Sequence, residues 1–307
     1  MRRASHAQEL TPFVNVAQYA RDVLALRGLI NTVWPGPDRP RLVTNDANPD
    51  PRYLQTLLNA TLGAVDVATW HLYIAYGLDP KLVEYAWSAS EMDKISTTAA
   101  GILAGVHGAG FKGEVWVGES AFAWHSGQAG VTNTFLSAPW WLSALGQLSP
   151  THSGFCRQTL IGGHYELIDK TTRSPNPDWY VARLWKDAMG PTAFSVATND
   201  TDLRAYAHCS PQGGLSIAFI NFSGNTTAAL DVRGQGALGT PRLLRVLASP
   251  DNTTVLLNGS PLTYVPGSGA LPPLSPASEP ADGPLLVAPH TLGFVTWPRA
   301  AAFNCKP

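Results

Sequence analysis

The sequence predicts an α/β domain followed by a smaller all-β domain. Up to about residue 189, helical stretches with apolar residues three and four apart alternate with short apolar strands, in repeats of about 30 to 40 residues. This alternation is typical of parallel strands joined by crossover helices. After Gly190-Pro191 the apolar pattern changes to two-residue alternation between Gly, Asn and Pro turns, which is typical of a β-sandwich. We therefore expect two domains, residues 1–190 and 191–307.

The elements of both domains follow from these patterns. Helices are expected at 16–33, 50–59, 90–106, 135–148 and 178–189. Strands of the first domain are expected at 41–44, 65–71, 115–117 and 155–161. Strands of the second domain are expected at 203–208, 215–221, 243–247 and 293–297, and residues 261–284, dense in Pro, Ser and Gly, predict a long loop.

Four parallel strands are too few to close a barrel, which takes eight in a (β/α) architecture. The first domain is therefore either an open sheet or the second half of a barrel. Open strand edges are a liability for a folded protein, so a chain with no independent fold is a further alternative.

The composition excludes several classes of function. Only 14% of the residues are charged and the net charge is −1, so no general field attracts nucleic acid or an anionic membrane. No apolar run approaches the length of a transmembrane helix. Nucleotide, zinc-protease and serine-hydrolase motifs are also missing, so we expect neither a cofactor nor a metal.

Other features indicate a secreted or extracellular protein, with a cell-wall, vacuolar, lysosomal or membrane-associated location left open. No apolar core follows Arg2 and Arg3, so we expect the signal peptide to be missing from this chain. Six Asn-X-Ser/Thr sequences are candidate glycosylation sites: Asn59, Asn199, Asn221, Asn225, Asn252 and Asn258.

The chain has three cysteines, which is too few for a fold built on disulfides. Cys209 and Cys305 lie in the same C-terminal region, and we predict that they pair. Cys156 follows Phe155 in an apolar stretch, where we expect it to pack as a small hydrophobic residue.

The candidate catalytic residue is Glu119. It follows the short strand Val115–Val117 and Gly118, at a strand end that a sheet would hold rigidly beside an open cleft. The simpler interpretation is a solvated loop glutamate or a salt-bridge partner.

Three other groups of polar and aromatic residues belong to the same predicted rim. They are His71 with Tyr73, the loop Trp124-His125-Ser126-Gly127, and the stretch from Arg157-Gln158 to Gly162-Gly163-His164-Tyr165. Taken singly, each is more often structural; His71, for example, could be an ordinary core histidine. Together they offer a carboxylate, imidazoles, an amide and aromatic faces, which suits a carbohydrate substrate.

The motifs around these residues resemble those of the heparanase-like proteins of glycoside hydrolase family 79, the plant-type branch in particular. The matching stretches are Trp116–Ser120, Ala123–Gly127, Cys156–Tyr165, Pro175–Tyr180 and Leu203–Cys209. The resemblance implies a (β/α)8 TIM barrel, of which this chain would hold the C-terminal half, followed by a β-sandwich. It also implies retaining β-glucuronidase activity on glucuronide-bearing glycans.

By the same resemblance, Glu119 would be the nucleophile. Substrate contacts would come from His71, Tyr73, Trp124, His125, Ser126, Gln158, Gly163 and Tyr165. The family's sandwich disulfide would correspond to Cys209 and Cys305.

The chain departs from the family pattern at the general acid. The family carries this glutamate in an Asn-Glu motif just before the helix that begins here near Val16, where this chain has only Gln8-Glu9-Leu10. We therefore expect the general acid to be absent, with Glu9 as a possible remnant, and activity to be impaired because a retaining mechanism needs two carboxyl groups. The alternative function is a non-catalytic protein that binds glycans or interacts with other proteins.

Overall fold

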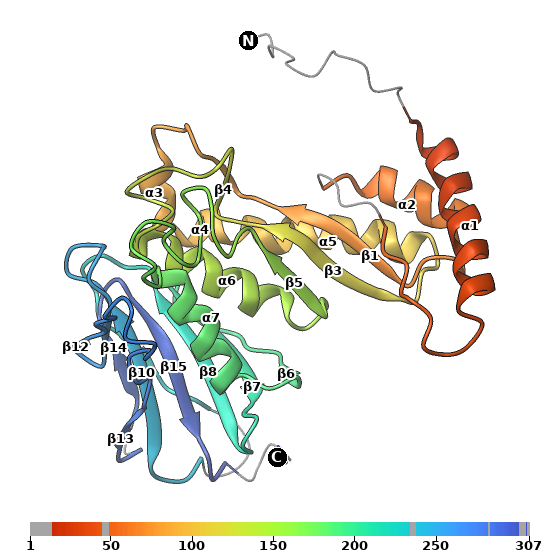
Figure 1. Cartoon of the computed structure of the whole chain (residues 1–307). Coiled ribbons are helices and arrows are strands. Elements are labelled where there is room, and N and C mark those ends of the chain that lie inside the picture. Colours follow the sequence, from red (N-terminus) through yellow and green to blue (C-terminus); the bar gives the residue numbers. More distant parts are fainter. Residues whose placement is uncertain (1–13, 45–48, 234–237, 282, 301–304, 306–307) are drawn as a thin grey trace. The chain divides into compact units, whose positions relative to one another are not determined.

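A computed structural model describes residues 14–44, 49–233, 238–281, 283–300 and 305 of the 307-residue chain (Figure 1). The chain divides into two compact units. The first unit is residues 1–70 and 99–116, and the second is residues 71–98 and 117–307.

The first unit contains the helices α1 (Val16–Val33), α2 (Pro51–Ala60) and most of α5 (Lys94–Gly108). The side chain of Asn15 caps α1 by accepting a hydrogen bond of 2.9 Å from the backbone N–H of Gln18. Asp50 caps α2 in the same way, and Pro51 occupies its first turn, where a missing N–H costs nothing.

One face of α1 buries a charge. The Arg27 side chain donates 2.6 Å to the carbonyl of Ala64 and forms an ion pair with Asp66, so this arginine is buried with Val23 and Ile30. The apolar side chains of Leu26 and Val33 in the same helix are exposed. The spacing predicted the helix, and the ion pair determined which side of it is buried.

A three-stranded sheet has the order β1 (Val67–Leu72), β3 (Glu114–Ser120), β5 (Gly154–Arg157). The predicted strand at 41–44 is only an isolated parallel bridge between Val43 and Val67. The carboxyl ends of the three strands lie side by side. The backbone N–H of Ala121 donates to the carbonyl of Leu72 (3.3 Å), and that of Gln158 donates to the carbonyl of Ser120 (2.8 Å). Residues that end these strands therefore meet at one edge.

Two strand predictions were wrong in length. β3 continues to Ser120, so Glu119 lies inside the strand and not in the loop after it. β5 ends at Arg157 and not near Ile161, and the chain beyond it turns at Gly162 and Gly163, which adopt positive φ angles.

The remaining helices lie in the second unit: α3 (Leu82–Ala86), α4 (Ala89–Met92), the 3-10 turn η1 (Phe135–Ser137), α6 (Ala138–Leu148) and α7 (Pro177–Ala188). Helix α6 is buried almost throughout, and it packs against α7, β7 and β8. Two short parallel strands, β2 (Ala75–Tyr76) and β4 (Ala123–Trp124), pair beside the sheet.

The C-terminal region forms an eight-stranded antiparallel sheet in the order β12-β11-β10-β15-β8-β7-β6, with β13 paired to β10. Its long strands are β7 (Leu203–Cys209), β8 (Leu215–Asn221), β10 (Arg242–Ala248) and β15 (Thr291–Trp297). Its short strands are β6 (Ala193–Phe194), β11 (Leu256–Leu257), β12 (Ser260–Pro261) and β13 (Ala277–Glu279). Three residues of the predicted loop 261–284 thus pair as β13.

A second layer covers one face of this sheet. The strands β9 (Ala228–Leu230) and β14 (Leu285–Val287) pair with each other, and their side chains share an apolar core with β7, β8, β10 and β15. The assignment of residues 1–190 as half a barrel and 191–307 as a sandwich domain stays a prediction.

A disulfide joins Cys209 and Cys305, the pair predicted from position. Two other predictions need correction. Cys156 is exposed and does not pack as a buried hydrophobic residue; it lies on β5, an edge strand of its sheet. Asn221 is buried and its side-chain amide donates to the carbonyls of Thr226, Val287 and Ala288, so it is not accessible for glycosylation in the folded protein.

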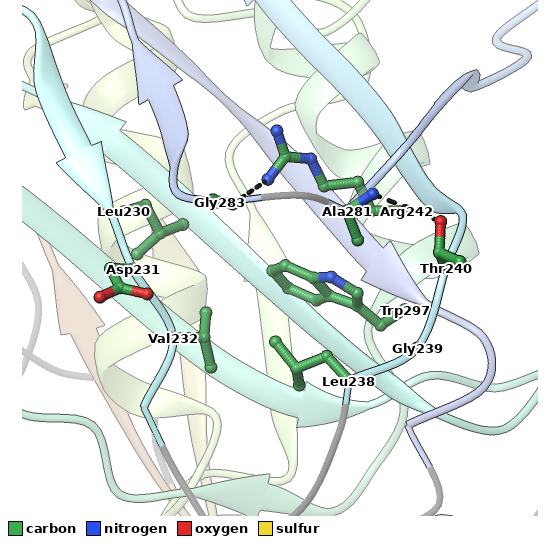
Figure 2. A pocket seen from close by; sticks show the side chains of 10 residues that line it. All are labelled: Leu230, Asp231, Val232, Leu238, Gly239, Thr240, Arg242, Ala281, Gly283 and Trp297. Atoms are coloured by element: carbon green, nitrogen blue, oxygen red, sulfur yellow. Dashed lines mark hydrogen bonds between the residues drawn. The ribbon is translucent and has the colours of Figure 1, made fainter.

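A cavity of about 430 Å³ borders the apolar core (Figure 2). Trp297 lies in it, and Arg242 is held there by Glu279 at 2.5 Å and by the carbonyl of Gly283 at 3.0 Å. None of the predicted site residues lines this cavity. Among the residues that the structure describes, no helix is long and apolar enough to cross a membrane.

Candidate active site

Glu119 is held by the sheet and still reachable from solvent. It is the next-to-last residue of β3, and 35% of its side chain is exposed. Val117 and Ser120 on either side of it in the strand are buried. The backbone of Glu119 is therefore fixed while its carboxylate stays open to a ligand.

Two side chains at the end of β1 contact the Glu119 carboxylate. The Tyr73 hydroxyl donates a hydrogen bond to Oε1, and His71 Nε2 lies 3.7 Å from Oε2. Burial, together with the hydrogen bond to Glu119, raises the pKa of Tyr73 above its ordinary value. Tyr73 therefore stays protonated at any physiological pH and acts as a permanent donor to the carboxylate.

Gln158 and Tyr165 form a second part of the site beyond the end of β5. The amide nitrogen of Gln158 lies 3.4 Å from the Tyr165 hydroxyl. Tyr165 also adds to the effects that raise the pKa of Tyr73. The amide and the two phenols can serve as hydrogen-bond partners for sugar hydroxyls.

A buried ion pair supports the end of β5. Arg157 Nη2 lies 2.7 Å from Asp178 Oδ2, and both side chains are almost fully buried. Ser137 donates to the same carboxylate oxygen at 2.7 Å, and the Arg157 guanidinium lies over the rings of Trp140 and Trp141. Burial raises the pKa of Asp178, against the opposing effect of the arginine. Sequence reasoning named Arg157 but missed Asp178, whose partner lies 21 residues away.

The loop after Glu119 has an unusual backbone. His125, Ser126 and Gly127 all have positive φ angles, near 65°, 63° and 71°. Such conformations are unfavourable for residues with a side chain and occur most often where the surrounding structure imposes them. This loop also packs closely against Gly77, where a Cβ would meet the carbonyl oxygens of Trp124 and Gly127 at 2.7 Å.

This loop presents an aromatic surface. Half of Trp124 is exposed (51%), and its ring lies 4.4 Å from that of Tyr76, which also lies 5.4 Å from the His125 ring. Sequence reasoning missed Tyr76. Its one signal was its position three residues after Tyr73 in the same segment.

The loop at Gly163 joins this surface to Tyr165. The N–H of His164 donates 2.6 Å to the Ser126 carbonyl, and Thr132 donates 2.6 Å to the His164 carbonyl. Glu166 is buried, and its carboxylate accepts hydrogen bonds from the backbone N–H groups of Gly162 and Lys170. These bonds fix the loop in place. Thr132 and Glu166 are structural residues that sequence reasoning did not find.

The structure thus gathers all nine predicted site residues at one edge of the sheet or on the loops beside it. Glu119, Tyr73 and His71 are in direct contact, and the remaining six lie in the loop that begins at β4 and in the segment after β5. Glu9, the candidate remnant acid, lies outside the described residues. Within the described ranges, no group of three or more His, Cys, Asp and Glu side chains could hold a metal ion.

Comparison with known proteins shows what the chain is similar to. The model for the N-terminal domain of glycosyl hydrolase family 79 matches residues 6–146. Heparanase-like protein 1 of Arabidopsis thaliana is 30% identical over 95% of this chain, and baicalin-β-D-glucuronidase of Scutellaria baicalensis is 31% identical over 96%. The chain is thus similar to heparanase-like proteins over almost its whole length.

The chain spans about three fifths of the length of these relatives: 61% of the Arabidopsis protein and 58% of the Scutellaria enzyme. Its fold is similar to that of a 4-O-α-L-rhamnosyl-β-D-glucuronidase from Fusarium oxysporum, with a TM-score of 0.72 and 14% identity over 92% of this chain and 65% of that one. It is also similar to an α-L-arabinofuranosidase from Thermotoga petrophila, with a TM-score of 0.68 and 15% identity over 92% and 62%. The mixed helix and sheet fold is thus one that glycoside hydrolases use.

Proposed function

We propose that this chain carries the nucleophile half of a retaining β-glucuronidase site, with Glu119 as the nucleophile. The observation that carries the proposal is the contact of Tyr73 and His71 with the Glu119 carboxylate at the carboxyl end of β3. Catalytic carboxylates of β/α architectures stand at such strand ends. The glucuronidase among the relatives supports the choice of sugar.

In this mechanism, one Glu119 oxygen attacks the anomeric carbon, and the bond from that carbon to the leaving oxygen breaks. Water then releases the sugar from the glycosyl-enzyme and restores the carboxylate. Tyr73 holds the carboxylate in position by its hydrogen bond. Gln158 and Tyr165 bond the sugar hydroxyls, and the Trp124 face stacks on the sugar or on the group attached to it.

The leaving oxygen also needs a proton. A second carboxyl group about 5 to 5.5 Å from the nucleophile supplies it in retaining enzymes. The site described here supplies the nucleophile and its two contacts, and Glu9 remains the one candidate acid that the sequence suggests. We expect strong dependence on the leaving group, because protonation is worth about a hundredfold to ten-thousandfold in rate.

The substrate that we propose is a glucuronide-bearing glycan or glycoprotein outside the cytoplasm. The disulfide between Cys209 and Cys305 supports this compartment, since disulfides persist where the environment is oxidising. Exposed Asn199, Asn225 and Asn252 are open to glycosylation there.

Two substrates with different leaving groups test the proposal. The chain should hydrolyse 2,4-dinitrophenyl β-glucuronide, whose leaving group needs no proton, and should hydrolyse methyl β-glucuronide much more slowly. Glu119→Gln should abolish the first reaction, whereas Glu114→Gln, on the same strand but paired with Arg41 at 2.7 Å, should not.

A chemical rescue identifies the nucleophile. In Glu119→Ala, azide should attack the anomeric carbon from the vacated side, expel dinitrophenolate and yield the α-glucuronosyl azide. Unchanged turnover in Glu119→Gln would overturn the assignment of Glu119. Tight binding of glucuronide without turnover of either substrate would support the non-catalytic glycan-binding alternative.

A further inference from the structure

We propose that the outer face of α7 carries a separate binding site for an acidic saccharide, in which Arg245 and Arg183 bind the carboxylate and Trp179 contacts the ring. This site lies in the second unit and shares no residue with the cluster at Glu119. It does not depend on Glu119 being a nucleophile.

The site is a cavity of about 500 Å³ between α7, β10 and the segment 271–276. Helix α7 contributes Trp179, Arg183 and Asp187, which are four residues apart in sequence and therefore lie on one face of the helix. That face adjoins the buried one, which holds Tyr180, Val181 and Leu184. A cavity of this size accommodates an oligosaccharide of a few rings.

Arg245 is the central charge of the cavity. It is partly buried, and its Nε donates 3.1 Å to the carbonyl of Leu274, which fixes the guanidinium against the segment 271–276. Its two Nη groups have no hydrogen-bond partner among the residues that the structure describes. Burial also lowers the pKa of Arg245, as expected for a guanidinium that water does not fully solvate. Two fixed donors thus remain for a ligand.

The charge balance of the cavity favours an anion. Asp187 lies 3.3 Å from Arg183 on the same helix and is the one acid in the lining. Two guanidinium groups therefore face a single carboxylate, which leaves a net positive charge. A planar guanidinium with two free donors matches the two oxygens of a carboxylate.

The aromatic wall selects a sugar over a small inorganic anion. Trp179 is partly exposed, and indole faces bind the apolar C–H face of pyranose rings. A uronic acid has both features, a carboxylate and an apolar ring face. The cavity in Figure 2 lacks this chemistry, because its Arg242 is already engaged by Glu279 and Gly283.

Binding is tested on the full chain carrying Glu119→Gln, so that turnover does not consume the probe. The probe is a tetrasaccharide of alternating glucuronate and N-acetylglucosamine, and its uncharged counterpart is chitotetraose. The readout is the indole N–H resonance of Trp179, assigned by its loss in Trp179→Phe. We expect the acidic tetrasaccharide to shift this resonance in a saturable way and chitotetraose to shift it weakly.

Adding Arg245→Gln should weaken the binding that this resonance reports by about tenfold or more, because it removes a charged donor pair. Arg183→Glu should weaken this binding as well. Because Arg183 takes no part in the hydrogen bond to Leu274, this second variant controls for a folding defect in Arg245→Gln. The matched control is Arg233→Gln, an exposed arginine paired with Asp231. Equal binding of chitotetraose, saturation by inorganic sulfate at the same concentration, or unchanged binding in both arginine variants would overturn the proposal.

Discussion

The phenol of Tyr73 donates a hydrogen bond to the carboxylate of Glu119, although the two residues are 46 positions apart in the chain. The contact exists because β1 and β3 are neighbours and end at the same edge of the sheet. The hydrogen bond thus connects the end of β1, one of the two strands beside β3, to the proposed nucleophile.

Removing this hydrogen bond should impair catalysis more than folding. A hydrogen bond to a charged group is worth about 1.5 to 3 kcal/mol, so Tyr73→Phe should lower kcat/KM for 2,4-dinitrophenyl β-glucuronide by about ten- to a hundredfold. Tyr85→Phe is the matched control, because its hydroxyl also donates to a carboxylate, that of Asp79 at 3.2 Å. Equal kcat/KM values in both variants would show that Tyr73 does not position Glu119.

Two glycines test the geometry of the loop that follows Glu119. Gly127 and Gly130 both have positive φ, so alanine at either should cost about 1 to 2 kcal/mol of folding free energy. A Cβ at Gly127 would also meet Thr132 Oγ1 at 2.3 Å and Tyr165 Cδ1 at 3.2 Å, whereas one at Gly130 meets nothing within 4 Å. Only Gly127→Ala should therefore reduce kcat/KM beyond what its stability loss explains. Similar kinetics in the two variants would argue against Tyr165 as a contact of the substrate.

The ion pair of Arg157 and Asp178 should dominate the stability of the site. Asp178→Asn leaves a buried guanidinium uncompensated and should lower the free energy of unfolding by about 3 to 5 kcal/mol. Ser137→Ala removes one hydrogen bond from the same carboxylate and should cost about 1 to 3 kcal/mol. Glu91→Gln, which breaks the exposed pair with Lys94, should cost less than about 1 kcal/mol in the same urea titration. The reverse ranking would mean that the pair is not buried in solution.

The buried His152 side chain should make the folded protein less stable in mild acid. Burial lowers its pKa to about 4 from an ordinary 6.5. Above pH 6.5 the imidazole is neutral in both states; between pH 6.5 and 4 only the unfolded chain takes up the proton, so stability falls as the pH falls. The loss should reach roughly 3 kcal/mol at pH 4.

His152→Gln should flatten the dependence of the unfolding free energy on pH in this window. His208 and His290, whose pKa values burial also lowers, act in the same direction, so part of the slope should remain. His107→Gln, at an exposed position, should leave the slope as it is. A wild-type curve that is already flat between pH 6.5 and 4 would contradict the buried state of His152.

The sequence was sufficient for elements with a regular apolar pattern. The spacing of apolar residues in α1 predicted both of its ends, and the two-residue alternation predicted β7, β8, β10 and β15 to within two residues. The strand-end rule also predicted that Glu119, His71 and Tyr73 would meet, because a parallel arrangement fixes which ends are neighbours.

Features that depend on distant partners were beyond the sequence. Arg27 is buried in α1 because Asp66 pairs with it, and Asn221 is buried because three carbonyls accept from its amide. Cys156 sits in an apolar stretch but is exposed on β5, the edge strand of its sheet. Local composition carries no information about such long-range contacts.

The disulfide between Cys209 and Cys305 has a consequence for proteolysis. The bond spans 96 positions and links β7 to residue 305, so a single cut anywhere in between cannot release a fragment. A protease that nicks the exposed Pro-rich segment 265–273 would leave the two pieces covalently attached. They would migrate as one species under non-reducing conditions and as two after reduction, so intact mobility alone does not demonstrate an uncut chain.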